Sequence, residues 1–307
     1  MYDVIIIGGG PAGVAAGVYV ARKKLNALLI TESFGGQSIV SDDIQNWIGT
    51  PHISGIDLAK GLEEHVKAQE TITVKEGELA EKVGEVPGGF SVATNKGNSY
   101  EGKTIILASG SRRKKLNVPG EKEFDGKGVA YCSTCDAPLF SGKRVGVVGS
   151  GNAGLEAVED LIPYASEIFI LEYSTTIKGD QVTQERIQSS DKLKGVMFNT
   201  AVKEVVGEKF ITGVRYQDQV TKEFKDMPLE GLFVEIGAIP NSEMVKGLVD
   251  MNERGEVIID SKNAKTSKEG IWAAGDVSDD PFKQNNISMG DAVKAALSCY
   301  QYLLSKK

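Results

Sequence analysis

Two cysteines are the residues of this 307-residue chain best placed to do chemistry. They lie in the segment YCSTCDAPLF, where Cys132 and Cys135 are separated by two residues and Asp136 follows directly. Thiols at this spacing can ligate a metal, close a structural disulfide or exchange electrons as a reversible dithiol.

A zinc site would need two more ligands, usually a second cysteine pair or two closely spaced histidines. The remaining candidates are His52, His65 and Cys299, and they are scattered along the chain. We therefore expect no metal. Cys299 lies in the helix-compatible segment AVKAALSCYQYLL, where a buried, apolar role is expected. Structural disulfides are rare in the cytosol, which favours redox exchange for the CxxC pair and leaves a structural pair as the plainer alternative.

A glycine-rich turn near the N-terminus indicates a dinucleotide. The segment DVIIIGGGPAG joins a short apolar strand to a helix-compatible stretch and contains Gly8, Gly10 and Gly13 in the pattern GxGxxG. These glycines permit a tight turn and let backbone amides approach a pyrophosphate at the helix N-terminus. The next predicted strand, ALLITE, ends on Glu32, which is placed to accept hydroxyl groups of a ribose.

The same pattern recurs about 140 residues later in RVGVVGSGNAG, with Gly149, Gly151 and Gly154, and the strand after it ends on Glu172. Two such units predict an α/β chain that binds two dinucleotides. Together with a dithiol they predict a route in which a hydride passes from nicotinamide to flavin, and electrons then pass from flavin to a disulfide.

The composition of the chain limits the classes of binding partner that we expect. The formal net charge of -7 gives no general attraction to nucleic acid or to an anionic membrane, although the RRKK segment at 112–115 is locally basic. The N-terminus lacks the pattern of a signal peptide, and no apolar run is long enough for a membrane span. We expect a cytoplasmic protein whose partners are proteins or small molecules.

In these motifs the chain resembles the low-molecular-weight thioredoxin reductases, a class of pyridine nucleotide-disulfide oxidoreductases. The shared motifs are GGGPAG at 8–13, GGQ at 35–37, IQNWIG at 44–49, CSTCD at 132–136, GSGNAG at 149–154 and GIWAAGD at 270–276. The resemblance implies an α/β fold with two Rossmann-like three-layer nucleotide-binding domains, the second inserted into the first. The FAD-binding domain would comprise residues 1–115 and 242–307, and the pyridine nucleotide-binding domain, with the CxxC, residues 116–241. It also implies a homodimer and relative rotation of the two domains.

The resemblance also implies roles for single residues. Cys135 is the flavin-side sulfur, Cys132 attacks the partner's disulfide, and Asp136 donates and accepts the proton of the dithiol; the alternative for Asp136 is a helix N-cap or a surface acid. The implied FAD residues are Gly8, Gly10, Pro11, Ala12, Gly13, Glu32, Gly36, Gln37, Asn46, Gly275, Asp276, Lys283, Gln284 and Asn285. The implied pyridine nucleotide residues are Gly149, Gly151, Asn152, Ala153, Gly154 and Glu172.

One departure from the family bears on the reductant. Members that prefer NADPH carry a cluster of the HRR type after the second Rossmann strand, to hold the 2′-phosphate. Here that position reads LEYSTTIKGDQ, so Glu172 would repel a 2′-phosphate and accept the ribose hydroxyls of NADH, and Lys178 is the one cation nearby. We expect NADH to be preferred over NADPH.

The same segment looks like the flavin domain of the alkyl hydroperoxide reductase flavoprotein subunit. That subunit carries additional N-terminal thioredoxin-like folds with a second CxxC, whereas this sequence starts at the FAD strand. The expected recipient is therefore a separate thioredoxin or glutaredoxin-like protein. Two alternatives stay open: a related flavoenzyme reduced by a donor such as reduced ferredoxin, and a flavin-bearing regulatory protein without turnover.

Overall fold

The chain divides into two compact units in the computed structural model, which describes residues 1–41 and 43–306. One unit comprises Met1–Arg112 with Ile239–Lys307, and the other comprises Arg113–Ala238. The predicted boundaries at 115 and 242 each fall three residues after the observed ones at 112 and 239. The predicted α/β class, with two Rossmann-like units, is confirmed.

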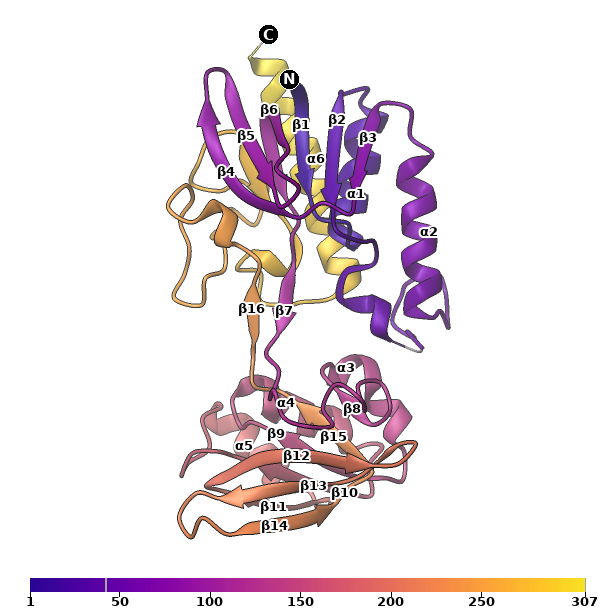
Figure 1. Ribbon diagram of the computed structural model, residues 1–307, viewed down its shortest axis with the longest axis vertical. Helices are drawn as coiled ribbons and strands as arrows, with labels where there is room; N and C mark the ends of the chain where they lie inside the picture. Colours follow the sequence, from indigo (N-terminus) through magenta and orange to yellow (C-terminus); the bar gives the residue numbers. More distant parts are fainter. Residues whose placement is uncertain (42, 307) are drawn as a thin grey trace. The chain divides into compact units, whose positions relative to one another are not determined.

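The first unit is built on a mixed sheet with strand order β3-β2-β1-β6-β5-β4 (Figure 1). Strand β17 also pairs with β6. Its strands are β1 (Tyr2–Ile7), β2 (Ala27–Thr31), β3 (Ile72–Glu76), β4 (Ala80–Val86), β5 (Gly89–Thr94), β6 (Ser99–Leu107) and β17 (Ile271–Ala273). Its α-helices are α1 (Pro11–Arg22), α2 (Gly55–Lys67) and α6 (Asn285–Ser305), and its 3-10 turns are η1 (Gly36–Val40), η3 (Glu243–Val245) and η4 (Gly275–Val277).

The apolar strand β1 is buried on both faces, as expected for a central parallel strand. Val4 and Ile6 face a core shared with α1, α2 and α6. Ile5 and Ile7 face a second core, shared with β4, β5 and residues 244–257. The unit therefore has three layers, and the β1–α1 turn lies at the carboxyl end of its central strand.

The second unit repeats this plan with a parallel five-stranded sheet in the order β11-β10-β9-β15-β8 and an antiparallel sheet, β12-β13-β14. Its strands are β8 (Val129–Ala130), β9 (Arg144–Val148), β10 (Glu167–Leu171), β11 (Leu193–Met197), β12 (Thr200–Gly207), β13 (Ile211–Asp218), β14 (Phe224–Pro228) and β15 (Gly231–Val234). Its helices are α3 (Ser133–Asp136), η2 (Ala137–Phe140), α4 (Asn152–Leu161) and α5 (Gln181–Gln188).

The layers of the second unit also follow from alternation along its strands. Val145 and Val147 of β9 pack in one core with α4, and Val148 packs in another core with β12 and β13. The two segments that connect the units, β7 (Ser111–Arg113) and β16 (Ala238–Pro240), pair with each other. No helix in the described part of the chain is long and apolar enough to span a membrane.

Candidate functional site

Both glycine-rich turns have the geometry that their sequences predict. The first glycine of each has a positive φ, +118° at Gly8 and +102° at Gly149. A Cβ added at Gly13 would lie 1.9 Å from the carbonyl oxygen of Gly8, and one at Gly154 would lie 2.2 Å from that of Gly149. In both units the helix is therefore packed directly on the turn, in a way that only glycine permits.

The helices after these turns begin without a side-chain cap. Gly10 is the N-cap of α1 and Gly151 is the N-cap of α4, and neither helix receives a capping side-chain hydrogen bond. The first backbone N–H groups of each helix are therefore available to an anion such as a pyrophosphate. Pro11 and Ala12 start α1, and Asn152 and Ala153 start α4.

The predicted flavin residues of the first unit gather from distant segments. The side-chain nitrogen of Gln37 donates to Oδ2 of Asp276 over 3.3 Å, across 239 positions of sequence. Nδ2 of Asn46 donates to Oε1 of Gln284 over 3.1 Å, and Oδ1 of Asn285 accepts from the Ser38 hydroxyl over 3.0 Å.

Gly36 and Gly275 allow the segments that carry these residues to lie close to the glycine-rich turn. A Cβ at Gly36 would lie 3.4 Å from the Cα of Gly10, and one at Gly275 would lie 3.2 Å from the Cβ of Ala12. The segments 8–13, 35–37 and 275–276 therefore converge in the first unit.

Four residues of this cluster were not predicted. The hydroxyl of Ser111 accepts from Gln37 over 3.2 Å, and the hydroxyl of Ser288 donates to Asp276 over 3.4 Å. Ser38 bonds Asn285, and the side chain of Asn286 donates to the backbone carbonyl of Asn46 over 2.8 Å. Ser38 and Asn286 adjoin predicted residues, which was a usable signal, whereas Ser111 and Ser288 belong to no recognisable motif.

Glu32 and Lys283, which were also predicted to bind FAD, take no part in these hydrogen bonds. Glu32 follows β2 directly, and its side chain is exposed, as a ribose acceptor requires. Lys283 bonds within the protein: its Nζ donates to the carbonyl of Ser278 and lies 3.1 Å from a carboxylate oxygen of Glu256. The Lys283 ammonium is therefore engaged with the loop before α6, and its predicted contact with the flavin stays a prediction.

The cysteines of the CxxC segment are joined as a disulfide in the second unit. Cys132 is the N-cap of α3, Cys135 lies within it, and their Cα atoms are 5.3 Å apart. Asp136 ends this helix and is the N-cap residue of η2, without a capping hydrogen bond from its side chain, so its role in proton transfer stays a prediction. Within residues 1–41 and 43–306, no group of three His, Cys, Asp or Glu side chains is arranged to hold a metal.

The two residues between the cysteines are fixed by an acid on α4. The hydroxyls of Ser133 and Thr134 both donate to Oδ2 of Asp160, over 2.8 and 3.1 Å. The CxxC turn is therefore tied to the helix that follows the second glycine-rich loop. Asp160 was not predicted from the sequence, because it lies 26 and 27 positions away from the two hydroxyls.

Glu172 directly follows β10, and its carboxylate is buried. One oxygen accepts from the backbone N–H and hydroxyl of Ser150, over 2.9 and 2.6 Å. The other accepts from the same two groups of Ser174, over 2.7 and 2.6 Å, and Nζ of Lys178 lies 3.8 Å from it. Burial raises the pKa of Glu172, but the hydrogen bonds from Ser150 and Ser174 outweigh it, so the net pKa is lowered.

This network already uses the acceptor positions of Glu172. A carboxylate offers about four lone-pair positions, and four protein donors occupy them. Glu172 thus ties the glycine-rich loop, through Ser150, to the loop after β10. Its role as a ribose acceptor stays a prediction, but its negative charge is fixed beside the loop.

Cys299 is fully buried in α6, as predicted, and its sulfur lies 3.3 Å from the hydroxyl of Thr104. Burial raises the pKa of its thiol to about 12. It therefore stays protonated and unreactive near neutral pH.

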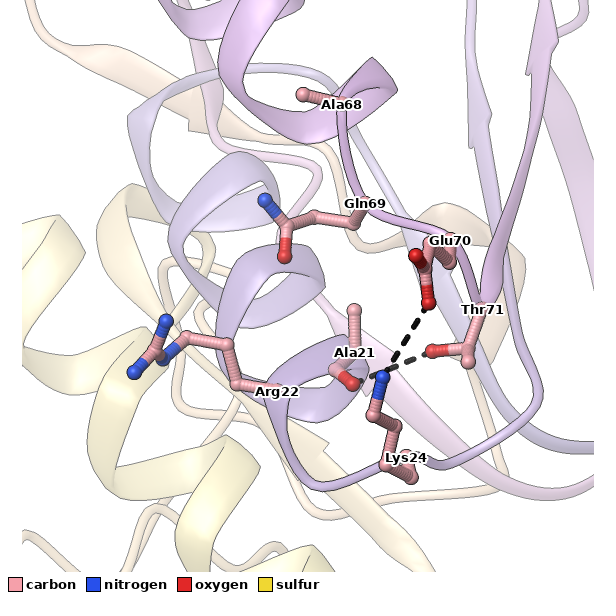
Figure 2. Close-up of a pocket in the computed structure, with 7 residues that line it drawn as sticks. All are labelled: Ala21, Arg22, Lys24, Ala68, Gln69, Glu70 and Thr71. Atoms are coloured by element: carbon pink, nitrogen blue, oxygen red, sulfur yellow. Dashed lines mark hydrogen bonds and ion pairs between the residues drawn. The ribbon is translucent and has the colours of Figure 1, made fainter.

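A cavity of about 340 Å³ lies at the other end of α1 (Figure 2). It is lined by Ala21, Arg22, Lys24, Ala68, Gln69, Glu70 and Thr71, and Lys24 pairs with Glu70 over 3.4 Å. At a rise of about 1.5 Å per residue, the length of α1 puts roughly 18 Å between this end and the glycine-rich turn. The cavity is therefore separate from the dinucleotide loop.

Comparison with known proteins agrees with this geometry. The profile of the family described as pyridine nucleotide-disulphide oxidoreductase matches residues 2–296. A Pseudomonas putida protein named as a component of alkyl hydroperoxide reductase is 41% identical over 99% of this chain and 58% of its own length. A Bacillus subtilis protein named NADH dehydrogenase is 42% identical over 99% of this chain and 59% of its own length. The chain thus spans less than two thirds of these relatives.

Solved structures give the same result. A thioredoxin reductase from Streptococcus pyogenes is 32% identical and superimposes with a TM-score of 0.91. The alignment covers 99% of each of the two chains. The family match spans both glycine-rich loops and the CxxC. The chain therefore belongs to the pyridine nucleotide-disulphide oxidoreductases and has the two-unit fold of the thioredoxin reductases.

Proposed function

We propose that the chain passes electrons from NADH, through FAD and the Cys132/Cys135 pair, to the disulfide of a thioredoxin or glutaredoxin-like protein. We further propose that it works as a homodimer in the cytoplasm. The observation that carries the proposal is the Cys132–Cys135 disulfide, held on α3 in the same unit as the second glycine-rich loop.

The first unit fits FAD. The backbone around Gly8, Gly10 and Gly13 leaves a cradle that side chains would fill, and the start of α1 presents uncapped N–H groups to a pyrophosphate. Glu32 would hold the adenosine ribose, and the amides and carboxylate of Gln37, Asn46, Asp276 and Gln284 would hold the polar groups of the flavin. We therefore assign residues 1–115 and 242–307 as the FAD-binding domain.

The second unit fits a pyridine nucleotide at Gly149, Gly151, Asn152, Ala153 and Gly154, and we assign residues 116–241 to that domain. When bound, the two cofactors supply a hydride donor and a two-electron carrier. NADH is favoured over NADPH because Glu172 is held ionised beside the loop and the neighbouring Lys178 is largely exposed. An ionised carboxylate at this position opposes a 2′-phosphate.

The residues of the CxxC segment would then do the thiol chemistry. Reduction of the disulfide gives two cysteine sulfurs, of which Cys132 attacks the partner's disulfide and Cys135 resolves the mixed disulfide. Asp136, the residue after Cys135, holds and returns the proton. A recipient that acts in alkyl hydroperoxide reduction is a second candidate, because relatives about 40% identical carry that activity in their name.

An anaerobic titration of the purified flavoprotein tests the reductant. We expect NADH to bleach the flavin absorbance, and at equal concentrations to do so at least about tenfold faster than NADPH, because of the fixed charge of Glu172. Equal rates would contradict the NADH preference. If neither nucleotide bleaches the flavin but reduced ferredoxin does, the proposed donor is wrong and the non-nicotinamide alternative holds.

A further inference from the structure

A buried glutamate lies beside the CxxC segment and takes no part in the proposed electron transfer. Glu235 follows the last residue of β15, and only 6% of it is exposed. The parallel pairing of β15 with β8 aligns Phe233 with Ala130, so Glu235 and Cys132 each lie two residues beyond this pair, on neighbouring segments of the chain. The segment EIGAIPN at 235–241 resembles a connector between the two domains, but the sequence predicts no chemical role for Glu235, because its burial depends on the assembly of the parallel sheet.

The charged groups around Glu235 come from three other elements. The positive charge of Arg113 on β7 favours the ionised form of Glu235, whereas the negative charges of Asp160 on α4 and Asp136 on α3 oppose it. Asp160 also fixes the two residues between the cysteines through its hydrogen bonds with Ser133 and Thr134. The CxxC turn is thus hydrogen-bonded to one carboxylate, Asp160, and lies beside a second, Glu235.

This arrangement places a titratable group close to a sulfur. Aligned residues of neighbouring strands have Cα atoms about 5 Å apart, so this register puts the Glu235 carboxylate within roughly 10 Å of Sγ of Cys132. At this distance, in a poorly solvated interior, an ionised carboxylate disfavours a thiolate, and a protonated one permits it.

Glu235 titrates in the range where this matters. Burial raises the pKa of its carboxyl group to about 7, and Asp160 and Asp136 act in the same direction, while Arg113 and the Ser133 N–H oppose them. Near neutral pH the group therefore exchanges a proton readily, as a proton acceptor coupled to thiol chemistry must.

We propose that Glu235 takes up a proton when the Cys132–Cys135 disulfide is reduced, and so allows one cysteine to remain a thiolate. With a small dithiol as reductant, the S–S bond breaks as the dithiol is oxidised to its own disulfide. Of its two protons, one goes to one cysteine sulfur and the other to Glu235, while the second cysteine stays anionic. Glu235 is a positioning residue here, acting on the thiolate through its charge, and this inference rests on the proposed dithiol function.

The test follows the thiols directly. The wild-type protein, Glu235→Gln and a control, Glu204→Gln, are reduced with dithiothreitol and freed of it. Alkylation of Cys132 and Cys135 by iodoacetamide is then measured by mass spectrometry between pH 5 and 9. The Gln side chain has nearly the same size and shape as Glu but carries no charge, and Glu204 lies on β12 in the separate three-stranded sheet.

In Glu235→Gln we expect the midpoint of the alkylation profile to fall by about one pH unit and the profile to narrow to a single titration. Glu235→Ala should give the same shift, and Glu204→Gln should match wild type. An unchanged midpoint in both Glu235 variants would overturn the inference. Because dithiothreitol is the reductant, the alkylation assay does not depend on NADH. A failure of NADH-dependent turnover would therefore count against the proposed function without changing the outcome of the alkylation assay.

Discussion

Replacing Cys135 with serine is expected to lower NADH-dependent reduction of a thioredoxin-like substrate by at least about 1,000-fold, because serine cannot form a disulfide with Cys132. The variant should fold normally, since serine is nearly isosteric and Cys135 is only half-buried in the short helix α3. It should also bind flavin to the same extent, because the predicted flavin residues belong to the other unit. The measurement is steady-state turnover with a supplied thioredoxin.

Cys299→Ser is the matched control. It makes the same substitution at a cysteine buried in α6, beside the Thr104 hydroxyl with which a serine can still bond. We expect its turnover to match wild type. Substrate reduction retained in Cys135→Ser would show that electrons bypass the pair. If the wild-type protein itself shows no turnover and the variant behaves like it in every assay, the flavin-bearing regulatory protein becomes the better hypothesis.

The parts of the site that sequence predicted are those fixed by local backbone geometry. The glycine-rich turns were recognisable because a positive φ at Gly8 and the contact of Gly13 with it are both settled within six residues. The CxxC disulfide is likewise closed within one helical turn. Such features need no knowledge of the rest of the fold.

The missing parts depend on contacts between distant segments. Asp160 reaches the CxxC turn only because α4 packs beside it, and Ser288 reaches Asp276 only because the start of α6 lies beside η4. The sequence assigned Glu172 to a ribose from its place at a strand end, but its four hydrogen bonds require two loops to close around it. Serine residues form hydrogen bonds in many contexts and have no characteristic sequence pattern here. The hydrogen bonds of these serines therefore could not be predicted without the fold.

Glu172→Ala is expected to raise the apparent KM for NADH roughly 100-fold with little change in flavin content, and to lower the free energy of unfolding by about 2–4 kcal/mol. The substitution leaves two backbone N–H groups and the Ser150 hydroxyl without their acceptor, and the Ser174 hydroxyl keeps only the carbonyl of Thr176. The glycine-rich loop therefore loses its tie to the loop after β10. Initial rates and chemical denaturation measure the two effects. Glu167→Ala, at the half-exposed start of β10, is the control and should change neither.

The contribution of Glu172 to the free energy of unfolding depends on pH. Because the pKa of Glu172 is lower in the folded protein than its ordinary value, its contribution is complete above that ordinary value and is lost as the pH falls through the lowered one. The difference in unfolding free energy between wild type and Glu172→Ala should therefore be constant near neutrality and shrink in acid. A difference that instead persists unchanged into acid would contradict the ionised network.

Ser174→Ala separates the two roles that Glu172 can have toward NADH. It removes one of the four hydrogen bonds and frees one lone pair of the carboxylate. If Glu172 acts by holding the loop, NADH binding weakens by roughly fivefold to tenfold, in line with the loss of one hydrogen bond to a charged group. If Glu172 accepts a ribose hydroxyl directly, the freed lone pair becomes available and NADH binding is unchanged or tighter. We expect the weaker binding, because all four acceptor positions are already used within the protein.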